Sequence, residues 1–235
     1  YHVLWLGGSQ LSQYHPDKDN FTNYNVSDSR AIWALYQGND EIMWVGGEGF
    51  GLRGFDIALK QVTHQYFNTS EARFIYDIVP NEKNNSLWIS SSGGLFLFFP
   101  ETGLIEQHLN QADLSLSEWV LGSLMVDNLG VVWIASNKGL ITYNPITKST
   151  QHYRHQESNE HSLSSDQLTN LYKDQEGNIW VGTDKKGLNL YDPFIDGFRQ
   201  FLPENPNDQT NKLPPVAIND IYQDFQKLHQ QYRIY

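Results

Sequence analysis

The sequence predicts an all-β fold, a β-propeller of four-stranded antiparallel blades with about five blade-equivalents. Three observations predict it. A blade-length unit recurs every 39 to 47 residues, each copy contains short strand-like segments, and no window keeps the i, i+3, i+4 apolar spacing of a helix. One tryptophan marks each copy: Trp5, Trp44, Trp88, Trp133 and Trp180.

Four strands are expected in each blade. The first strand reads IWALYQ, IYDIVP, LGSLMV, LTNLYK and INDIYQ. The second strand holds the repeated tryptophan, as LWLGG, MWVGG, LWISS, VWIAS and IWVGT. A third strand begins at a leucine that follows a turn glycine in four copies, and its fourth position is aromatic: Tyr14, Phe55, Phe98, Tyr143 and Tyr191.

Proline ends the third strand in four copies, because it cannot continue a strand ladder. A short fourth strand then follows, as FTNY, HQYF, EQHL, QHYR and FRQF. Blades of a propeller stack face to face, so both faces of their strands can be apolar. We therefore expect the five repeated tryptophans to be core residues and not platforms for a ligand.

The domain organisation follows from the phase of the repeats. They occupy residues 1–24, 30–67, 73–109, 119–153 and 167–201, with residues 216–224 as the opening strand of a further blade. Residues 1–235 would form a single propeller domain if the N- and C-terminal strands shared one closing blade, which removes exposed edges. The alternative is a segment of a longer propeller. The start without methionine, inside a strand-like pattern, favours a piece of a longer polypeptide whose targeting signal and other domains are absent.

Composition narrows the classes of partner. There are 16 Lys and Arg against 27 Asp and Glu, a formal net charge of -11, so a phosphate backbone would be repelled and we expect no nucleic-acid partner. The absence of cysteine excludes disulfides and thiolate metal sites. No apolar run is long enough for a membrane span, so we expect membrane attachment only through flanking segments.

The last full repeat resembles the two-component regulator propeller repeat. The resemblance rests on an Asp-x-x-Gly pattern before the tryptophan strand, a Gly-Leu pair and a Tyr-Asp-Pro ending, carried by Asp174, Gly177, Asn178, Trp180, Val181, Gly182, Thr183, Gly187, Leu188, Tyr191, Asp192 and Pro193. It implies the periplasmic sensor part of a bacterial membrane regulator with a histidine kinase or diguanylate cyclase output. It also implies a ligand, often a carbohydrate, and a homodimer formed through the parent regulator.

No constellation of side chains points to catalysis. Asp and Glu lie mainly in turn-like segments such as DKDN and DQEGN, where local hydrogen bonds stabilise loops. His152, His155 and His161 lack a metal-ligand spacing with a further ligand, and no nucleophile elbow, phosphate loop or dinucleotide fingerprint is present. We expect no catalytic residue, no metal and no cofactor.

The expected binding surface is the mouth of the central channel, where the innermost strands begin. One column of these strands is small or polar and is expected to face channel water: Ala34, Asp77, Ser123, Asn170 and Asp220. Positions that differ between copies are freer to serve function. The candidate ligand-binding residues are Arg30, Trp33, Arg73, Tyr76, Trp119 and Asn170, where aromatic rings would stack on a ligand and guanidinium groups would bind its hydroxyls or carboxylates. Inter-blade packing is the alternative role for either tryptophan.

The sequence thus favours a sensor module that binds a small molecule, an oligosaccharide or a partner at the channel mouth. A propeller-type lyase or glycoside hydrolase acting on polysaccharide is one alternative, and it would need convergent carboxylates or a histidine at the mouth. A structural interaction scaffold is another.

Overall fold

The structure is a computed structural model that describes residues 3–38, 41–67, 72–110 and 121–203, together with 213, 217–219 and 221. These residues form antiparallel β-sheets and no helix, which confirms the predicted fold class. Within them, no helix is long and apolar enough to cross a membrane.

Each predicted repeat forms one sheet whose strands follow chain order. The first sheet has three described strands, β1 (Trp5–Gly7), β2 (Leu11–His15) and β3 (Asn20–Tyr24). The other four sheets are four-stranded. They consist of β4 (Ile32–Gln37), β5 (Ile42–Gly47), β6 (Leu52–Asp56) and β7 (Gln61–Tyr66); β8 (Ile75–Asn81), β9 (Ser86–Ser91), β10 (Gly94–Phe99) and β11 (Leu104–Leu109); β12 (Leu121–Val126), β13 (Val132–Ser136), β14 (Gly139–Asn144) and β15 (Ser149–Tyr153); and β16 (Leu168–Lys173), β17 (Ile179–Thr183), β18 (Leu188–Asp192) and β19 (Gly197–Phe201).

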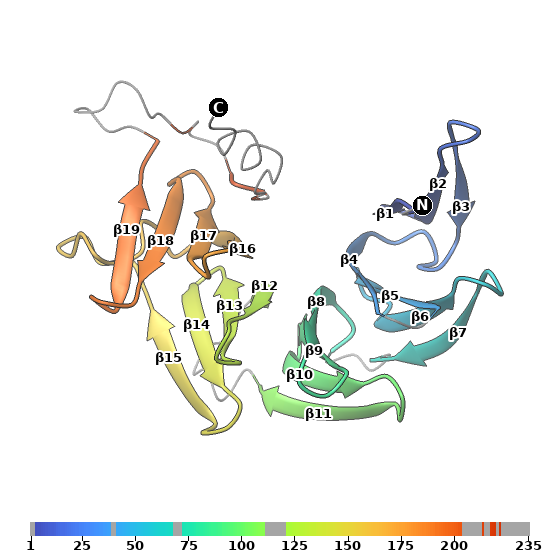
Figure 1. The fold of residues 1–235 in the computed structure, drawn as a ribbon, viewed down its shortest axis with the longest axis horizontal. Coiled ribbons are helices and arrows are strands. Elements are labelled where there is room, and N and C mark those ends of the chain that lie inside the picture. The colour runs from blue at the N-terminus through green and yellow to red at the C-terminus, as the bar shows by residue number, and fades with distance from the viewer. Residues whose placement is uncertain are drawn as a thin grey trace, which may run out of the picture.

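The sheets stand side by side as blades around a common centre (Figure 1). We number the blades one to five in chain order. The first strands of blades two to five, β4, β8, β12 and β16, lie innermost and contact one another from blade to blade. The fourth strands, β7, β11, β15 and β19, lie at the periphery. Blades one and five stand on either side of the open part of the arc.

The repeated tryptophans hold neighbouring blades together. Trp44, Trp88 and Trp133 are 2%, 1% and 4% exposed, which confirms the prediction that these three are core residues. Trp5 and Trp180, in the first and last described blades, are only half-buried. The ring of Trp44 packs edge-on against Phe98 of the next blade at 4.9 Å between centroids, and Trp88 packs in the same way against Tyr143 at 6.2 Å. The aromatic column of the third strand is therefore the partner of the tryptophan in the preceding blade.

The polar column of the inner strands also connects blades. Asp77 Oδ2 accepts a hydrogen bond from the backbone N–H of Leu124 at 2.7 Å, and Ser123 Oγ accepts one from the N–H of Leu171 at 3.3 Å. The expectation that this column faces channel water is wrong for Ala34, which is only 5% exposed. Asp77 and Ser123 are half-buried, because their oxygens bond the backbone of the next inner strand.

The described part of the C-terminal segment contacts blade five. Ile218 donates its N–H to the carbonyl of Thr183 at 3.2 Å, as Ile32 of blade two donates to the carbonyl of Gly8 in blade one at 2.8 Å. Ile218 thus forms the same kind of backbone hydrogen bond to blade five that the first residue of β4 forms to blade one. Whether residues 216–224 complete blade one or open a further blade stays a prediction.

Candidate functional site

A bulge at the start of each inner strand positions the candidate residues. The register between the first and second strands shifts between Ile32 and Ala34 in blade two and between Ile75 and Asp77 in blade three. A β-bulge leaves one residue outside the ladder and re-aims its side chain. The residues at the bulges are Trp33 and Tyr76, and this irregularity turns two aromatic rings of neighbouring blades toward each other.

These rings form an aromatic shelf, which we define as Trp33, Phe74 and Tyr76. Trp33 and Tyr76 are stacked with centroids 5.7 Å apart and planes 6° from parallel. Phe74 lies on the same stack, 6.3 Å from Trp33 with 21° between planes. Trp33 is 47% exposed, so one large ring of the stack is open to solvent across the junction of blades two and three.

Two arginines flank the shelf. The guanidinium of Arg30 donates from Nη1 to the carbonyl of Gly49 at 2.6 Å, which ties this cation to the loop after β5. The guanidinium carbon of Arg73 lies 5.3 Å from the ring centroid of Phe74, a distance typical of a cation–π contact. Both side chains are exposed, so the shelf is bordered by positive charge although the whole chain is acidic.

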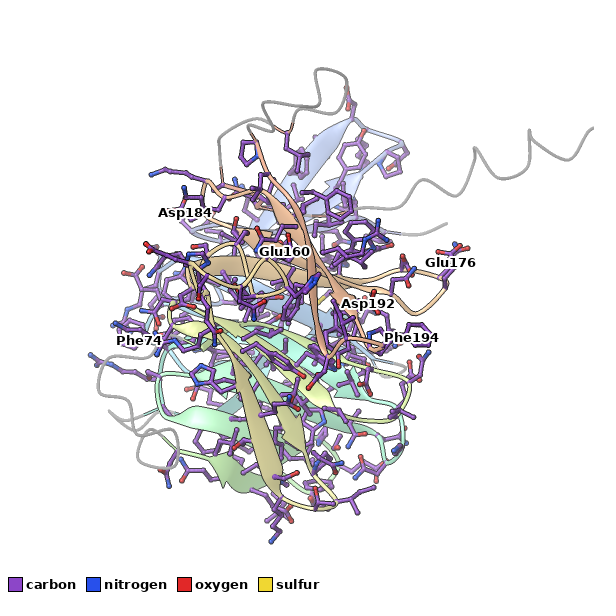
Figure 2. The ribbon with its side chains drawn as sticks, turned by 90° about the vertical axis from the view of Figure 1, so that its left-hand side faces the viewer. Phe74, Glu160, Glu176, Asp184, Asp192 and Phe194 are labelled. Carbon is purple, nitrogen blue, oxygen red and sulfur yellow. The ribbon has the colours of Figure 1, made fainter. Side chains whose placement is uncertain are left out.

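The shelf occupies one of the two faces of the propeller. Figure 2 shows the blades from the side, with Phe74 and Asp184 at one face and Glu176 and Phe194 at the other. We call the first the shelf face, where inner strands begin. The second is the hairpin face, which carries the turns between the first and second strands, including Glu176.

Four of the predicted site residues come together. Arg30, Trp33, Arg73 and Tyr76 lie at the shelf, on segments that begin blades two and three. Asn170 lies on β16 of blade five, and the inner strand β12 stands between β16 and the strands of the shelf. Its Oδ1 is buried without a hydrogen-bond partner among the described residues. Trp119 lies outside the described residues.

Sequence reasoning missed Phe74, the third ring of the shelf. Phe74 directly precedes the inner strand β8. The residue in the same position is Ala31 before β4 and Gln167 before β16. The sequence did offer a signal for this ring, because the position holds an aromatic residue in blade three and a small or polar residue in these other copies. Burial raises the pKa of the Tyr76 hydroxyl, so this ring stays neutral at physiological pH.

The chemistry available at the shelf is stacking, cation–π contact and hydrogen bonding from guanidinium groups. Among the residues that the structure describes, no three His, Cys, Asp or Glu side chains are grouped to hold a metal ion. The arrangement suits a planar or ring-shaped ligand with hydroxyl or carboxylate oxygens at its edge.

Comparison with known proteins places the repeat in a family. Residues 162–185 match the family model described as two component regulator propeller. This chain contains a two component regulator propeller repeat. The matched segment runs from the loop before β16 to the turn after β17 of blade five, and it includes the hydrogen bond between Trp180 Nε1 and Asp174 at 3.0 Å.

A histidine kinase and the extracellular domain of a two component system are similar to most of this chain. Histidine kinase P4 of Formosa agariphila is 31% identical over 198 residues, which cover 78% of this chain and 14% of that protein. The extracellular domain of the hybrid two component system BT4673 from B. thetaiotaomicron is 26% identical to this chain with a TM-score of 0.68, and the match covers 80% of this chain and 25% of that one. The present chain therefore spans about a seventh of the kinase and a quarter of the extracellular domain.

A more distant likeness concerns the fold alone. A virginiamycin B lyase from Staphylococcus aureus superposes with a TM-score of 0.65 at 10% identity, over 85% of this chain and 65% of the lyase. Identity this low carries no function, so the enzyme alternative gains only a shared propeller architecture from it.

Proposed function

We propose that this regulator propeller is part of the extracytoplasmic, periplasmic sensor region of a bacterial membrane-bound signalling protein. The similarity to a histidine kinase and to the extracellular domain of a hybrid two component system supports this role. The segment itself acts by binding and carries no catalytic step. Its parent protein pairs with a second copy to pass the signal on.

The ligand binds at the aromatic shelf. The observation that carries this is the exposure of Trp33, 47% of which is open to solvent while its ring is held parallel to Tyr76 at the bulges of two inner strands. A ring that is ordered before binding loses little conformational entropy when a ligand stacks on it. Arg30 and Arg73 then bind oxygens at the edge of the ligand. An oligosaccharide or another small molecule with a flat apolar face and polar edges fits this surface.

The test is a binding screen on the purified propeller. Oligosaccharides would be titrated while tryptophan fluorescence and heat of binding are recorded, first on the wild type and then on Trp33→Ala and Tyr76→Ala. We expect each variant to weaken binding by about tenfold, because the ligand loses its stacking surface.

Phe194→Ala is the matched control, since Phe194 is 97% exposed on the opposite face and its loss should leave the affinity unchanged. Equal weakening by all three variants, or full affinity of Trp33→Ala for every ligand found, would contradict binding at the shelf.

A further inference from the structure

The same hydrogen bond connects an aspartate on the hairpin face to the repeated tryptophan in blades four and five. Asp127 Oδ2 accepts the indole N–H of Trp133 at 2.9 Å, and Asp174 Oδ2 accepts that of Trp180 at 3.0 Å. In both blades the aspartate precedes its tryptophan by the same number of residues, so the turn carries a carboxylate that fills the space beside the indole edge.

Blade two lacks this carboxylate. Gly38 stands at the corresponding position before Trp44, so no side chain extends from this position toward the indole edge. Trp44 is 2% exposed, and its N–H has no hydrogen-bond partner among the described residues. The indole nitrogen is not one of the buried side-chain atoms that lack a partner, so it is accessible from the pocket beside it and can donate to an acceptor that enters there.

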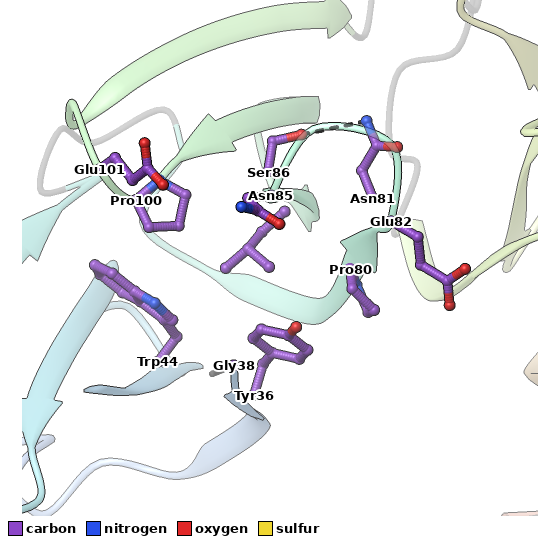
Figure 3. Close-up of a pocket in the computed structure, with 11 residues that line it drawn as sticks. Tyr36, Gly38, Trp44, Pro80, Asn81, Glu82, Asn85, Ser86, Pro100 and Glu101 are labelled. Carbon is purple, nitrogen blue, oxygen red and sulfur yellow. Dashed lines mark hydrogen bonds between the residues drawn. The ribbon is translucent and has the colours of Figure 1, made fainter. Parts of the chain in front are cut away.

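The space left by the missing side chain is an open pocket of about 420 Å³ between blades two and three. Figure 3 shows the indole nitrogen of Trp44 on the side of the ring that faces the pocket, with Tyr36 and Pro80 beside it and Pro100 above. The volume lies in the range of small-molecule sites. Tyr36 and Pro80 come from the ends of β4 and β8, whereas Trp33 and Tyr76 lie at the starts of the same strands. The pocket and the shelf are therefore on opposite faces.

The rim of the pocket is acidic. Glu82 and Glu101 lie on opposite sides of it (Figure 3), both are exposed, and neither forms an ion pair with a described residue. No Lys or Arg is among the residues that line it. The net charge of -11 adds a field that attracts cations. An anionic ligand would be repelled here, unlike at the shelf.

We propose that this pocket is a second binding site, selective for a small amine that carries a hydroxyl or carbonyl oxygen close to its nitrogen. The oxygen accepts the indole N–H of Trp44. The ammonium group lies in the field of Glu82 and Glu101, and the carbon skeleton contacts Tyr36 and the two prolines. A neutral sugar can accept the indole N–H of Trp44 but is not attracted by the two carboxylates. A simple alkylamine is attracted by the carboxylates but has no oxygen to accept the N–H.

The test uses three such amines, glucosamine, ethanolamine and lysine, with glucose as the uncharged match for glucosamine. Two-dimensional NMR of the 15N-labelled propeller would follow the indole N–H of Trp44, which Trp44→Phe assigns. We expect at least one amine to shift this resonance at millimolar concentration, with glucose at least about tenfold weaker. The affinity should fall as salt rises, since the attraction is screened.

Two variants test the site, one by filling the pocket and the other by removing its negative charge. Gly38→Asp introduces beside Trp44 a carboxylate equivalent to those of Asp127 and Asp174. This carboxylate should accept the indole N–H, raise the melting temperature and abolish amine binding. Glu82→Gln with Glu101→Gln leaves the pocket open and should weaken the amine about tenfold while glucose is unaffected.

The controls separate this site from the shelf. Trp33→Ala should leave amine binding unchanged, whether or not a ligand for the shelf is found. The proposal is overturned if none of the three amines shifts the Trp44 resonance, if glucose binds as tightly as glucosamine, or if the double glutamine variant keeps full affinity. Should Gly38→Asp fail to fold, the double variant and the glucose comparison still decide the matter.

Discussion

The carboxylate of Asp77 accepts the backbone N–H of Leu124 at 2.7 Å and thereby joins the inner strands of blades three and four. Its other oxygen accepts the N–H of Ile78 at 2.8 Å. Burial raises the pKa of this carboxyl, and the donors from Leu124, Ile78 and Ser123 oppose that rise. One side chain therefore satisfies two backbone groups at a blade junction.

Replacing Asp77 should weaken this junction. Asp77→Ala leaves the N–H groups of Leu124 and Ile78 without their acceptor, so we expect a loss of about 2–3 kcal/mol in the free energy of unfolding, measured in urea. Asp77→Asn keeps one accepting oxygen and should lose less. Asp184→Ala, at an exposed position of the shelf face, is the control, and a similar loss there would contradict a specific role for Asp77.

The two kinds of tryptophan should respond differently to truncation. Trp88→Ala removes a ring that is 1% exposed and leaves a cavity against Tyr143, so a loss of about 3–5 kcal/mol in unfolding free energy is expected. Trp33→Ala removes a ring that is 47% exposed and should lose about 1 kcal/mol or less. Chemical denaturation of both variants measures the contrast, and equal losses would show that Trp33 is a packing residue.

His108 should make blade three sensitive to acid. It packs against Trp88 at 4.8 Å between centroids, bonds the Tyr143 hydroxyl through Nδ1 at 3.0 Å and has Glu106 3.6 Å from Nε2. Burial lowers its pKa, and Glu106 only partly opposes this. The folded protein thus holds a neutral ring, which contributes stability above the unfolded pKa of about 6.5 and loses that contribution as pH falls through the folded value.

The measurement is urea unfolding at pH 7.5 and pH 5 of the wild type and His108→Phe. The variant keeps the aromatic packing without a titrating ring, so its stability should fall less on acidification. His161→Gln, at an exposed loop position, is the matched control. An unchanged pH dependence in His108→Phe would rule out this histidine as the sensitive group.

Asp196 should connect blades four and five in a way that also depends on pH. Its Oδ1 accepts hydrogen bonds from the hydroxyls of Tyr153 at 2.8 Å and Tyr191 at 2.9 Å. Its Oδ2 accepts one from Nε2 of Gln151 at 2.9 Å. The donors from Tyr153, Gln151 and Tyr191 lower its pKa more than burial raises it. This stabilisation is present above the unfolded pKa of about 3.9 and is lost as pH falls through the folded value.

The variant Asp196→Asn tests that connection. Asparagine tolerates the left-handed backbone at this position, where φ is 46°, but one of its side-chain groups donates and cannot accept. We expect a modest loss of stability at pH 7, because the site is exposed, and little difference from the wild type at pH 2. Thermal melting at the two pH values checks this, and a loss that persists at pH 2 would point to the backbone and not to the charge.

Within a blade, sequence reasoning succeeded because each strand is a local pattern. The position of Trp44 on a second strand, of Phe55 on a third and of Pro100 at a strand end all follow from alternation, turn residues and the absent N–H of proline. At the candidate site the same reasoning brought Arg30, Trp33, Arg73 and Tyr76 to the start of two inner strands, because repeat alignment places equivalent positions at the same end of each blade.

Between blades, reasoning from the sequence did not predict the contacts between segments that are far apart in the chain. By itself the sequence determined the repeat and the strand order within each blade, since these depend on neighbours a few residues away. Only the tertiary structure decided that Trp33 stacks on Tyr76, that Asp77 bonds Leu124 and that Gly38 leaves a pocket beside Trp44. Each of these depends on a bulge or a blade junction, where small changes in backbone direction choose which side chains meet.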